Sequence, residues 1–264
     1  MNKKLSIIIV HYQKPPILRL CLKSIKNSVK DIDYEIVVAD SASTEKSRDV
    51  LIEEFPDVSF IPFKENTGYS KGVNAALEAS SGEYVFIANP DIVVFDDSIN
   101  KLIKVLENDK TIGIVGPSLL NFNDTSQPSC FRFYTPTTIA CRRTFLGRMP
   151  YFKNILDRFL MSDKDLKTSQ EVDWIMGSAM MTRRDYIKKV GLMDERFFLY
   201  FEDVDWCKRF WDNGLKVIYY PEAQMYHYHQ RKSSKGLGIL DLFLRKETRW
   251  HLTSGFKYFL KHGV

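Results

Sequence analysis

Short apolar segments alternate with helix-like segments through the first half of this chain, and that alternation allows few folds. The segments that resemble buried strands cover residues 5–10, 34–39, 58–63, 84–88 and 112–115. The helices expected between them lie near residues 16–29, 45–55, 72–80 and 97–108. Strands that are apolar on both faces and separated by helices are typical of a parallel sheet with helices on both sides. The sequence therefore predicts an α/β fold with a mostly parallel sheet flanked by helices.

At 264 residues, the chain suits one large α/β domain or one domain with an appendage. We expect the domain to cover residues 1–230 and to have two halves, 1–120 and 172–230. Between them, residues 121–171 contain Pro128, Pro136 and Pro150 and are predicted to form an irregular, partly mobile excursion. Aromatic residues such as Phe131 and Tyr134 indicate that this excursion packs on the domain.

Residues 231–264 form a basic, aromatic and strongly helical tail, which carries eight Lys or Arg against two Asp or Glu. This excess accounts for the whole net charge of +5, so the basic character concerns partners rather than the fold. The mixture of Arg249, Trp250, Phe256 and Lys261 suits a helix on an anionic membrane surface. It equally suits a helix that packs on the domain with its lysines in solvent, and the sequence leaves both open.

Several classes of protein are disfavoured. No segment approaches the ~20 apolar residues that a membrane span needs, and the apolar start is too short for a signal peptide. The four cysteines are scattered and suggest reduced thiols, so we expect a cytoplasmic protein. No G-x-G-x-x-G or P-loop motif follows a strand. Basic charge without a recognisable motif is weak evidence for nucleic-acid binding, which we do not expect.

Polar residues follow four of the expected strands or their loops, where a core would not need them. They are His11-Tyr12, Asp40-Ser41, the stretch 66–74 and Asn89-Pro90-Asp91. The carboxyl ends of parallel strands meet at one edge of the sheet, so these clusters should converge. Each has a simpler explanation as a turn, a helix cap or a solvated lysine. Together they favour a site for a nucleotide diphosphate, with an aromatic for the base and a carboxylate, Asp91, for a divalent cation.

Three carboxylates, Glu202, Asp203 and Asp205, stand where an aromatic segment passes into a helix. Acidic residues in a first helical turn ordinarily interact with the helix dipole. Here the aromatic neighbours would partly desolvate a carboxylate and raise its pKa towards that of a general base. On the helix, Glu202, Asp205 or Trp206, and Arg209 share a face that Asp203 does not.

The order of these motifs resembles the family 2 glycosyltransferases, which have the GT-A fold, and within them the bacterial rhamnosyltransferases. The motifs are Ile7-Ile-Ile-Val-His-Tyr12, Val37-Val-Ala-Asp-Ser-Ala-Ser43, Asn66-x-Gly-Tyr-Ser-Lys-Gly-Val-Asn74, Asn89-Pro-Asp91, Trp174-x-x-Gly-Ser-Ala179 and Phe198-x-Tyr-Phe-Glu-Asp-Val-Asp205. The resemblance extends to about His229 and implies a role for each matching residue.

The resemblance implies that Asp203 is the catalytic base and that Trp174, Gly177 and Glu202 line the acceptor and sugar pocket. It implies that Asp91 and His227 hold Mg²⁺ or Mn²⁺, with His229 or a purely structural histidine as the alternative to His227. The residues that it implies for the nucleotide are His11, Tyr12, Asp40, Asn66, Gly68, Lys71 and Asn89. Two positions depart from the family pattern: Asn89 replaces an acid of a fuller metal motif, and Ser41 replaces a frequent Asn.

The resemblance thus implies an inverting transferase that moves L-rhamnose from dTDP-L-rhamnose to a glycan or a polyprenyl-diphosphate-linked acceptor. The setting would be cell-surface polysaccharide synthesis, in the cytoplasm or at the inner face of the cytoplasmic membrane. Two alternatives stay open at this stage. One is a family 2 enzyme with a UDP-sugar donor (galactofuranose, glucose or N-acetylglucosamine), and the other is a non-catalytic nucleotide-sugar or glycan-binding protein. The oligomeric state is not predicted.

Overall fold

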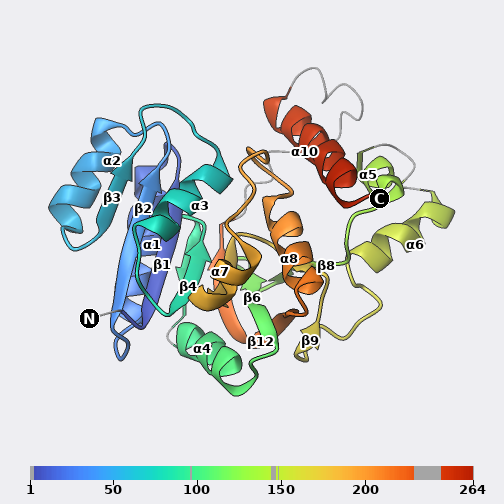
Figure 1. Cartoon of the computed structure of the whole chain (residues 1–264), viewed down its shortest axis with the longest axis horizontal. Helices are drawn as coiled ribbons and strands as arrows, with labels where there is room; N and C mark the ends of the chain where they lie inside the picture. The colour runs from blue at the N-terminus through green and yellow to red at the C-terminus, as the bar shows by residue number, and fades with distance from the viewer. Residues whose placement is uncertain (1–2, 96, 144–146, 148, 229–244, 264) are drawn as a thin grey trace.

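The computed structural model of the chain describes residues 3–95, 97–143, 147, 149–228 and 245–263. Its main feature is a curled sheet flanked by helices (Figure 1). Among the described residues ten strands join this sheet, with the order β3-β2-β1-β4-β11-β6-β12-β5 and with β7 and β9 as short additions. The strands are β1 Leu5–His11, β2 Tyr34–Asp40, β3 Ser59–Pro62, β4 Tyr84–Ala88, β5 Ile92–Val94, β6 Ile112–Leu120, β7 Ser126–Gln127, β9 Gln170–Glu171, β11 Ala179–Arg183 and β12 Lys216–His227.

Helices cover both faces of the sheet, which confirms the predicted three layers. One core lies beneath α1, η1 and α4, and the other beneath α3, α7 and α8. Alternate residues of β1 point into the two cores, with Ile7 and Ile9 in the first and Ile8 in the second. The helices are α1 Pro15–Ser28, α2 Glu45–Asp49, η1 Val50–Glu54, α3 Tyr69–Glu78, α4 Ser98–Asn108, α5 Pro136–Arg143, α6 Pro150–Phe159, α7 Arg184–Val190, α8 Glu202–Asp212 and α10 Lys246–His262.

The sheet is mixed, whereas the sequence pattern of the first half indicated a parallel one. Strands β3, β2, β1 and β4 are parallel, as expected. Strand β11 enters between β4 and β6 and is antiparallel to both. The pattern could not show this, because a buried strand is apolar on both faces in either direction. Strand β5, which pairs antiparallel with β12, was likewise not expected.

The strand directions bring several loops to one edge of the sheet. His11 at the end of β1 stands opposite Asp40 at the end of β2, and β4 ends beside them. The antiparallel β11 begins at this same edge, since Ala179 pairs with Ala88. The turn just before β11, which contains Gly177, therefore lies near the carboxyl ends of the parallel strands. Strand β12 ends close by, with His227 opposite Ile92.

The excursion at residues 121–171 is more regular than its composition suggested. It contains β7, α5 and α6 as well as β8 (Cys130–Phe131), which pairs with β10 (Trp174–Ile175) in a small second sheet. Several of its described aromatic residues pack as expected: Phe131 stacks on Trp174 at 4.4 Å between ring centroids, and Tyr134 contacts Phe159. The excursion is therefore a packed part of the fold.

The C-terminal helix α10 lies against the body of the protein, above α8 and beside α5 (Figure 1). Its inner face, which includes His251, Ser254 and Tyr258, is buried, while Phe256 and Leu260 are exposed. The described part of the tail is thus a helix packed on the domain, as one alternative predicted, but Lys261 is not in solvent, because it pairs with Asp194 and Asp205. Residues 231–244 of the predicted helical tail and the alternative histidine His229 lie outside the described residues. Within the described chain, no helix is long and apolar enough to cross a membrane.

Candidate active site

A buried His–Asp pair lies at the edge where β1 and β2 end. His11 Nδ1 is 2.6 Å from Asp40 Oδ1, and both side chains are fully buried. The backbone N–H of Lys14 donates to His11 Nε2, so Nδ1 carries the proton and donates to Asp40. The other carboxylate oxygen of Asp40, Oδ2, is buried and accepts no hydrogen bond from any described residue. His11 therefore orients Asp40, and a direct contact between either of these buried side chains and a nucleotide stays a prediction.

The loop before α3 closes over this edge through a second polar network. Asn66 Oδ1 accepts from Ser41 Oγ at 3.1 Å and from the N–H of Gly68 at 3.0 Å. Gly68 has φ +82°, a backbone conformation that side chains rarely adopt, and a Cβ there would lie 2.6 Å from the carbonyl oxygen of Phe198. Asn66 and Gly68 thus form a turn, and this structural role is compatible with a role in nucleotide binding. Lys71 is exposed in the first turn of α3.

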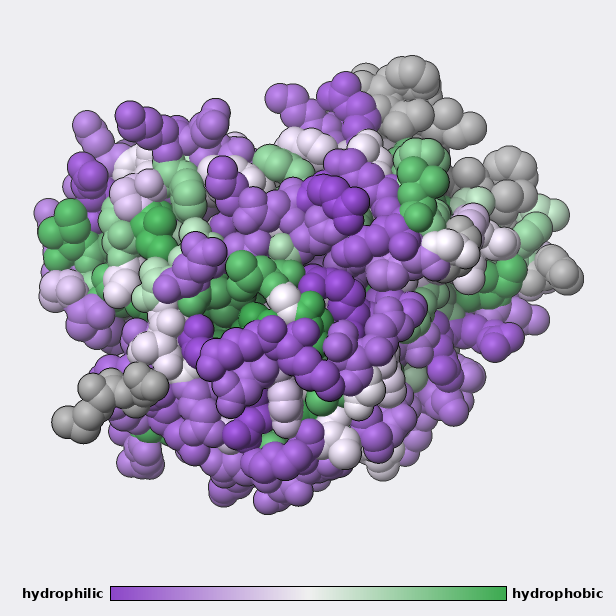
Figure 2. Space-filling view, in the orientation of Figure 1, coloured by the Kyte–Doolittle hydropathy of each residue, from purple (hydrophilic) through white to green (hydrophobic). Residues whose placement is uncertain are grey.

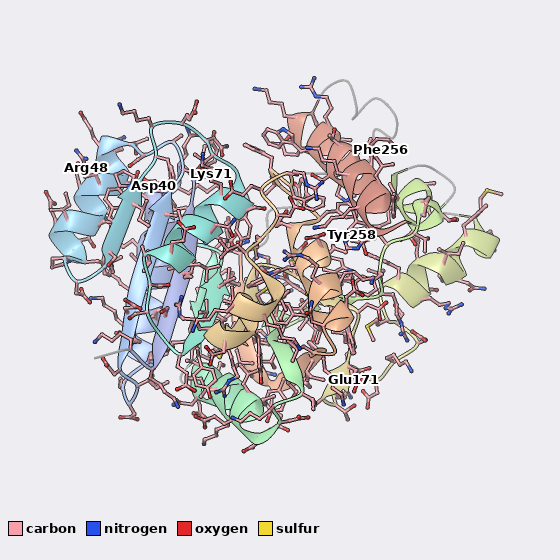
Figure 3. All side chains as sticks on the ribbon, viewed as in Figure 1. Asp40, Arg48, Lys71, Glu171, Phe256 and Tyr258 are labelled. Atoms are coloured by element: carbon pink, nitrogen blue, oxygen red, sulfur yellow. The ribbon has the colours of Figure 1, made fainter. Side chains whose placement is uncertain are left out.

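Asp40 and Lys71 lie near the same end of the sheet in Figure 3, on β2 and α3. Tyr12 is 47% exposed at this end, so its ring is accessible. Thr44, rather than Asp40 or Ser43, caps α2 in a reciprocal capping box with Ser47. Asp40 is consequently available for a role other than helix capping.

A second polar pair, Asp91 and His227, joins the loop after β4 to the end of β12. Their side chains approach to 3.5 Å between Asp91 Oδ1 and His227 Nε2. Gln127 fixes the histidine, because its amide nitrogen donates to the His227 carbonyl oxygen and its Oε1 lies 3.0 Å from Nδ1. Nδ1 donates to Gln127 Oε1, and Nε2 faces Oδ1 of Asp91.

This pair fits a divalent cation that takes most of its ligands from a bound diphosphate. Asp91 Oδ1 is buried, accepts no hydrogen bond among the described residues and lies 3.5 Å from Nε2 of His227. The described part of the chain has no group of three or more His, Cys, Asp or Glu that could form a protein-only metal cage. Mg²⁺ is commonly held by one or two carboxylates plus substrate phosphates. The backbone N–H of the neighbouring Asn89 donates to the carbonyl oxygen of Ser178.

The two adjacent acids that begin α8 are buried, and Asp203 is held in place by backbone groups. Its Oδ2 accepts from the N–H of Gly177 at 2.9 Å, and its Oδ1 accepts from the N–H of Val204. Burial raises the pKa of Asp203 to about 6, although these hydrogen bonds act to lower it. A carboxylate at this position is thus desolvated, as predicted, because Asp203 is buried.

Glu202 is also buried, and its Oε2 has no hydrogen-bond partner among the described residues. Burial, and then the charge of Asp203, raise the pKa of Glu202 well above its usual range. Asp205 takes a separate direction from Asp203 and pairs with Arg209 at 3.0 Å, as the helical spacing predicted. The two adjacent acids therefore form one coupled pair, of which Asp203 ionises more readily.

Tyr69, to which the sequence analysis assigned no role, links the nucleotide side of the site to the acidic pair. Its hydroxyl donates to the carbonyl oxygen of Gly177 at 2.7 Å. Burial raises its pKa well above the usual value, and the charges of Glu202, Asp203 and Asp91 add to this shift. Tyr69 stands in the motif that begins at Asn66, but a tyrosine in a helix's first turn carries no distinctive signal. Gln127, the partner of His227, was missed for the same reason.

The side chain of Trp174 is buried and does not line an open surface. It is buried in the aromatic cluster with Phe131, and its indole N–H donates to the carbonyl oxygen of Arg132. Gly177, three residues further on, contacts Asp203 directly, since a Cβ there would lie 3.2 Å from the Cβ of Asp203. The structure thus places Gly177 beside the acidic pair and Trp174 in the aromatic cluster. A direct contact between Trp174 and a sugar stays a prediction.

The mixed sheet flanked by helices, with Asp40, Asp91 and the pair Glu202-Asp203 near one of its edges, is consistent with the glycosyltransferases of GT-A fold. The model of the family "Glycosyl transferase family 2" matches residues 6–191, and that of "Glycosyl transferase family group 2" matches residues 130–260. The chain belongs to glycosyl transferase family 2.

Two curated relatives cover most of the chain. The N-acetylglucosaminyl-diphospho-decaprenol L-rhamnosyltransferase of Mycobacterium tuberculosis is 26% identical over 248 residues, which are 89% of this chain and 79% of the relative. The rhamnosyltransferase WbbL of Escherichia coli is 23% identical over 273 residues, 98% of this chain and 93% of the relative.

Two solved glycosyltransferases share the fold at low sequence identity. GalNAc-T7 with UDP, GalNAc and Mn²⁺ superposes with a TM-score of 0.66 at 15% identity over 88% of this chain, which spans only 45% of that longer chain. The mannosyltransferase PcManGT of Pyrobaculum calidifontis, with GDP-Man and Mn²⁺, gives a TM-score of 0.60 at 18% identity over 97% of this chain and 74% of its own. The predicted GT-A fold is confirmed.

Proposed function

We propose that this protein is an inverting rhamnosyltransferase that uses dTDP-L-rhamnose as the donor. The acceptor would be a hydroxyl of a lipid-linked or oligosaccharide substrate in cell-surface polysaccharide synthesis. The rhamnosyltransferase relatives support the donor sugar. The observation that carries the proposal is the buried, backbone-held Asp203, whose pKa of about 6 suits a base at neutral pH.

In this reaction the acceptor hydroxyl attacks the anomeric carbon of the donor sugar as Asp203 takes its proton. The new bond joins the acceptor oxygen to the anomeric carbon, and the bond from that carbon to the diphosphate oxygen breaks. The leaving group is the nucleoside diphosphate, and the configuration inverts because there is one displacement. Such a mechanism needs one base rather than the two carboxylates of a retaining hydrolase. Glu202, whose raised pKa favours the protonated form, is suited to donate a hydrogen bond to a sugar hydroxyl.

Asp91 and His227 would hold Mg²⁺ or Mn²⁺ against the donor diphosphate. A bound cation there offsets the negative charge of the leaving diphosphate. On the nucleotide side, the free oxygen of Asp40 is suited to accept from the N–H of a pyrimidine base. Tyr12 and Lys71 are exposed at the same edge and are suited to contact the base and the phosphates. These groups would accept either dTDP or UDP, so they do not choose between the two donors.

The outer face of α10 suits contact with an anionic membrane that carries a lipid-linked acceptor. Phe256 and Leu260 are 64% and 69% exposed, with Arg249 exposed on the same helix. Figure 2 shows this hydrophobic patch at the upper right, and Figure 3 places Phe256 on the outer side of the helix. The double change Phe256→Ser with Leu260→Ser should weaken co-sedimentation with anionic vesicles. Equal sedimentation of the variant and the wild type would reject this contact.

The test of the proposed function is transfer from a panel of nucleotide sugars, with wild type compared with Asp91→Ala and Asp203→Asn. Turnover of dTDP-rhamnose that both variants lose supports the proposal and both site assignments. Turnover of a UDP-sugar instead would keep the mechanism and replace the donor. Binding of a nucleotide without turnover of any donor, in the presence of membrane extract as a source of acceptor, would favour a binding protein that kept the fold.

A further inference from the structure

The last turn of α10 is joined to the first turn of α8, the helix that begins with the acidic pair Glu202 and Asp203. Asp205 is fully buried, and its Oδ1 lies 2.6 Å from Lys261 Nζ and 2.8 Å from His262 Nε2. Its Oδ2 pairs with Arg209 within α8. A buried carboxylate needs such partners, because an unpaired charge in the interior is costly. The residues that satisfy Asp205 thus come largely from α10.

Further contacts fasten α10 to the segment just before α8. Lys261 also reaches Asp194 at 2.8 Å, and Lys257 donates to the carbonyl oxygen of Arg196. Ser254 Oγ donates to the carbonyl oxygen of Leu199 at 3.0 Å. The hydrogen bond from Arg196 and the charge of Lys261 hold the pKa of Asp194 well below its usual range, so it is ionised at neutral pH. Residues 194–205 are therefore held at several points along α10.

The segment held in this way has a strained backbone next to the acidic pair. Tyr200 and Phe201, the two residues before Glu202, have φ values of +67° and +68°. The left-handed region costs a non-glycine residue roughly 1–2 kcal/mol, and such strain persists only where the surroundings enforce it. Phe201 contacts Tyr258 of α10 at 5.5 Å between ring centroids. Gly255 permits this packing, because a Cβ there would lie 3.2 Å from the Phe201 ring.

The same helix also reaches the nucleotide side of the site. The ring of Trp250 lies 4.9 Å from the ring of Phe198. The carbonyl oxygen of Phe198 accepts from the N–H of Tyr69, and its ring lies against Gly68. Helix α10 therefore contacts, through one continuous segment, both the loop at Gly68 and the helix that begins at Glu202.

We propose that α10 is a positioning element of the active site, with Lys261 and Ser254 as positioning residues. They hold the strained segment 197–201 so that Asp203 meets the N–H of Gly177 while Phe198 supports the loop at Gly68. This role rests on the proposed function only in taking Asp203 as the base. Neither residue touches the donor or the acceptor, and each acts through the segment that it holds.

The test compares Lys261→Met with Lys246→Met, a lysine exposed at the start of the same helix. It also compares Ser254→Ala with Thr253→Ala, its exposed neighbour. We expect Lys261→Met and Ser254→Ala to lower kcat by about 10- to 100-fold, since a small misplacement of a catalytic group has effects of that size. The donor KM should change little, and Lys261→Arg should restore most of kcat. In the same variants, amide hydrogen exchange should speed up at residues 197–206, while the unfolding transition stays in the working range.

Unchanged exchange at residues 197–206, or a loss of kcat equal to that in the exposed controls, would overturn the proposal. Faster exchange with a normal kcat would overturn the positioning role and leave a structural one. If the wild type transfers no sugar, the proposed function fails by itself. The exchange of residues 197–206 then still decides whether α10 holds the segment, because that measurement needs no turnover.

Discussion

The N–H of Gly177 donates to Oδ2 of Asp203 at 2.9 Å, and this bond joins the turn before β11 to the first turn of α8. It orients the carboxylate and favours its charged form, whereas burial favours the neutral form. Burial has the larger effect, and the pKa of Asp203 settles at about 6. The carboxylate is therefore ionised near neutral pH and still basic enough to take a proton.

The rate of transfer should rise with pH through about 6 and then level off, because a general base works only when it is ionised. The sign follows from the raised pKa: below it, Asp203 carries a proton and cannot accept another. A profile of kcat/KM between roughly pH 4.5 and 8 measures this, with far-UV circular dichroism at each pH as the control for folding. A rate that falls as pH rises through 6 would contradict Asp203 as the base.

Gly177→Ala should lower kcat by roughly 10-fold, with little change in stability. A Cβ at this position would lie 3.2 Å from the Cβ of Asp203 and 3.4 Å from its Oδ2, so the carboxylate must shift by a few tenths of an ångström. The misplacement of a base lowers the rate of the step that it assists. Steady-state kinetics with a thermal unfolding curve would show this. An unchanged kcat would mean that the position of Asp203 tolerates the shift.

Much of the fold followed from the sequence, because the helix and strand patterns of the first half are strong. The strand predicted at residues 84–88 matches β4, and the polar clusters Asp40-Ser41 and Asn89-Pro90-Asp91 lie at the expected sheet edge. The antiparallel direction of β11 was not predictable, since its pairing with β4 joins residues far apart in the sequence. Local patterns report burial but carry no information on which strands become neighbours.

The candidate site was only partly predictable for a related reason. Carboxylates such as Asp203 are conspicuous because acids next to an aromatic segment are unusual. Residues that act through long-range contacts, such as Tyr69 and Gln127, look ordinary in the sequence. Their roles depend on partners about a hundred residues away, Gly177 and His227. The strained backbone at Tyr200 and Phe201 was also invisible, because neither residue type favours that conformation.

Gly68→Ala should destabilise the protein by about 2 kcal/mol or more and weaken nucleotide binding. The left-handed backbone alone costs alanine about 1–2 kcal/mol. The Cβ would also stand 2.6 Å from the carbonyl oxygen of Phe198, so the segment before α8 must move.

The matched control for Gly68→Ala is Gly214→Ala, which has φ +73° and no atom within 4 Å of its Cβ. Both variants carry the backbone strain, and only Gly68→Ala adds the clash. The difference between their free energies of unfolding in urea thus measures the contact with Phe198. Equal losses of stability in the two variants would show that Phe198 moves away from the added Cβ at no cost in free energy.

Weakening of the metal site should raise the concentration of Mg²⁺ or Mn²⁺ that half-saturates sugar transfer. With Asp91→Asn, the half-saturating Mg²⁺ or Mn²⁺ should rise by more than 100-fold, because one of the two candidate protein ligands loses its charge. Gln127→Ala should have a smaller effect, about 10- to 100-fold, which is typical when a partner that orients a metal ligand is removed. Asp185→Asn, at an exposed helical ion pair, is the control and should behave as the wild type. Transfer that survives exhaustive chelation, with all four proteins equally active, would show that Asp91 and His227 do not hold a cation during the reaction.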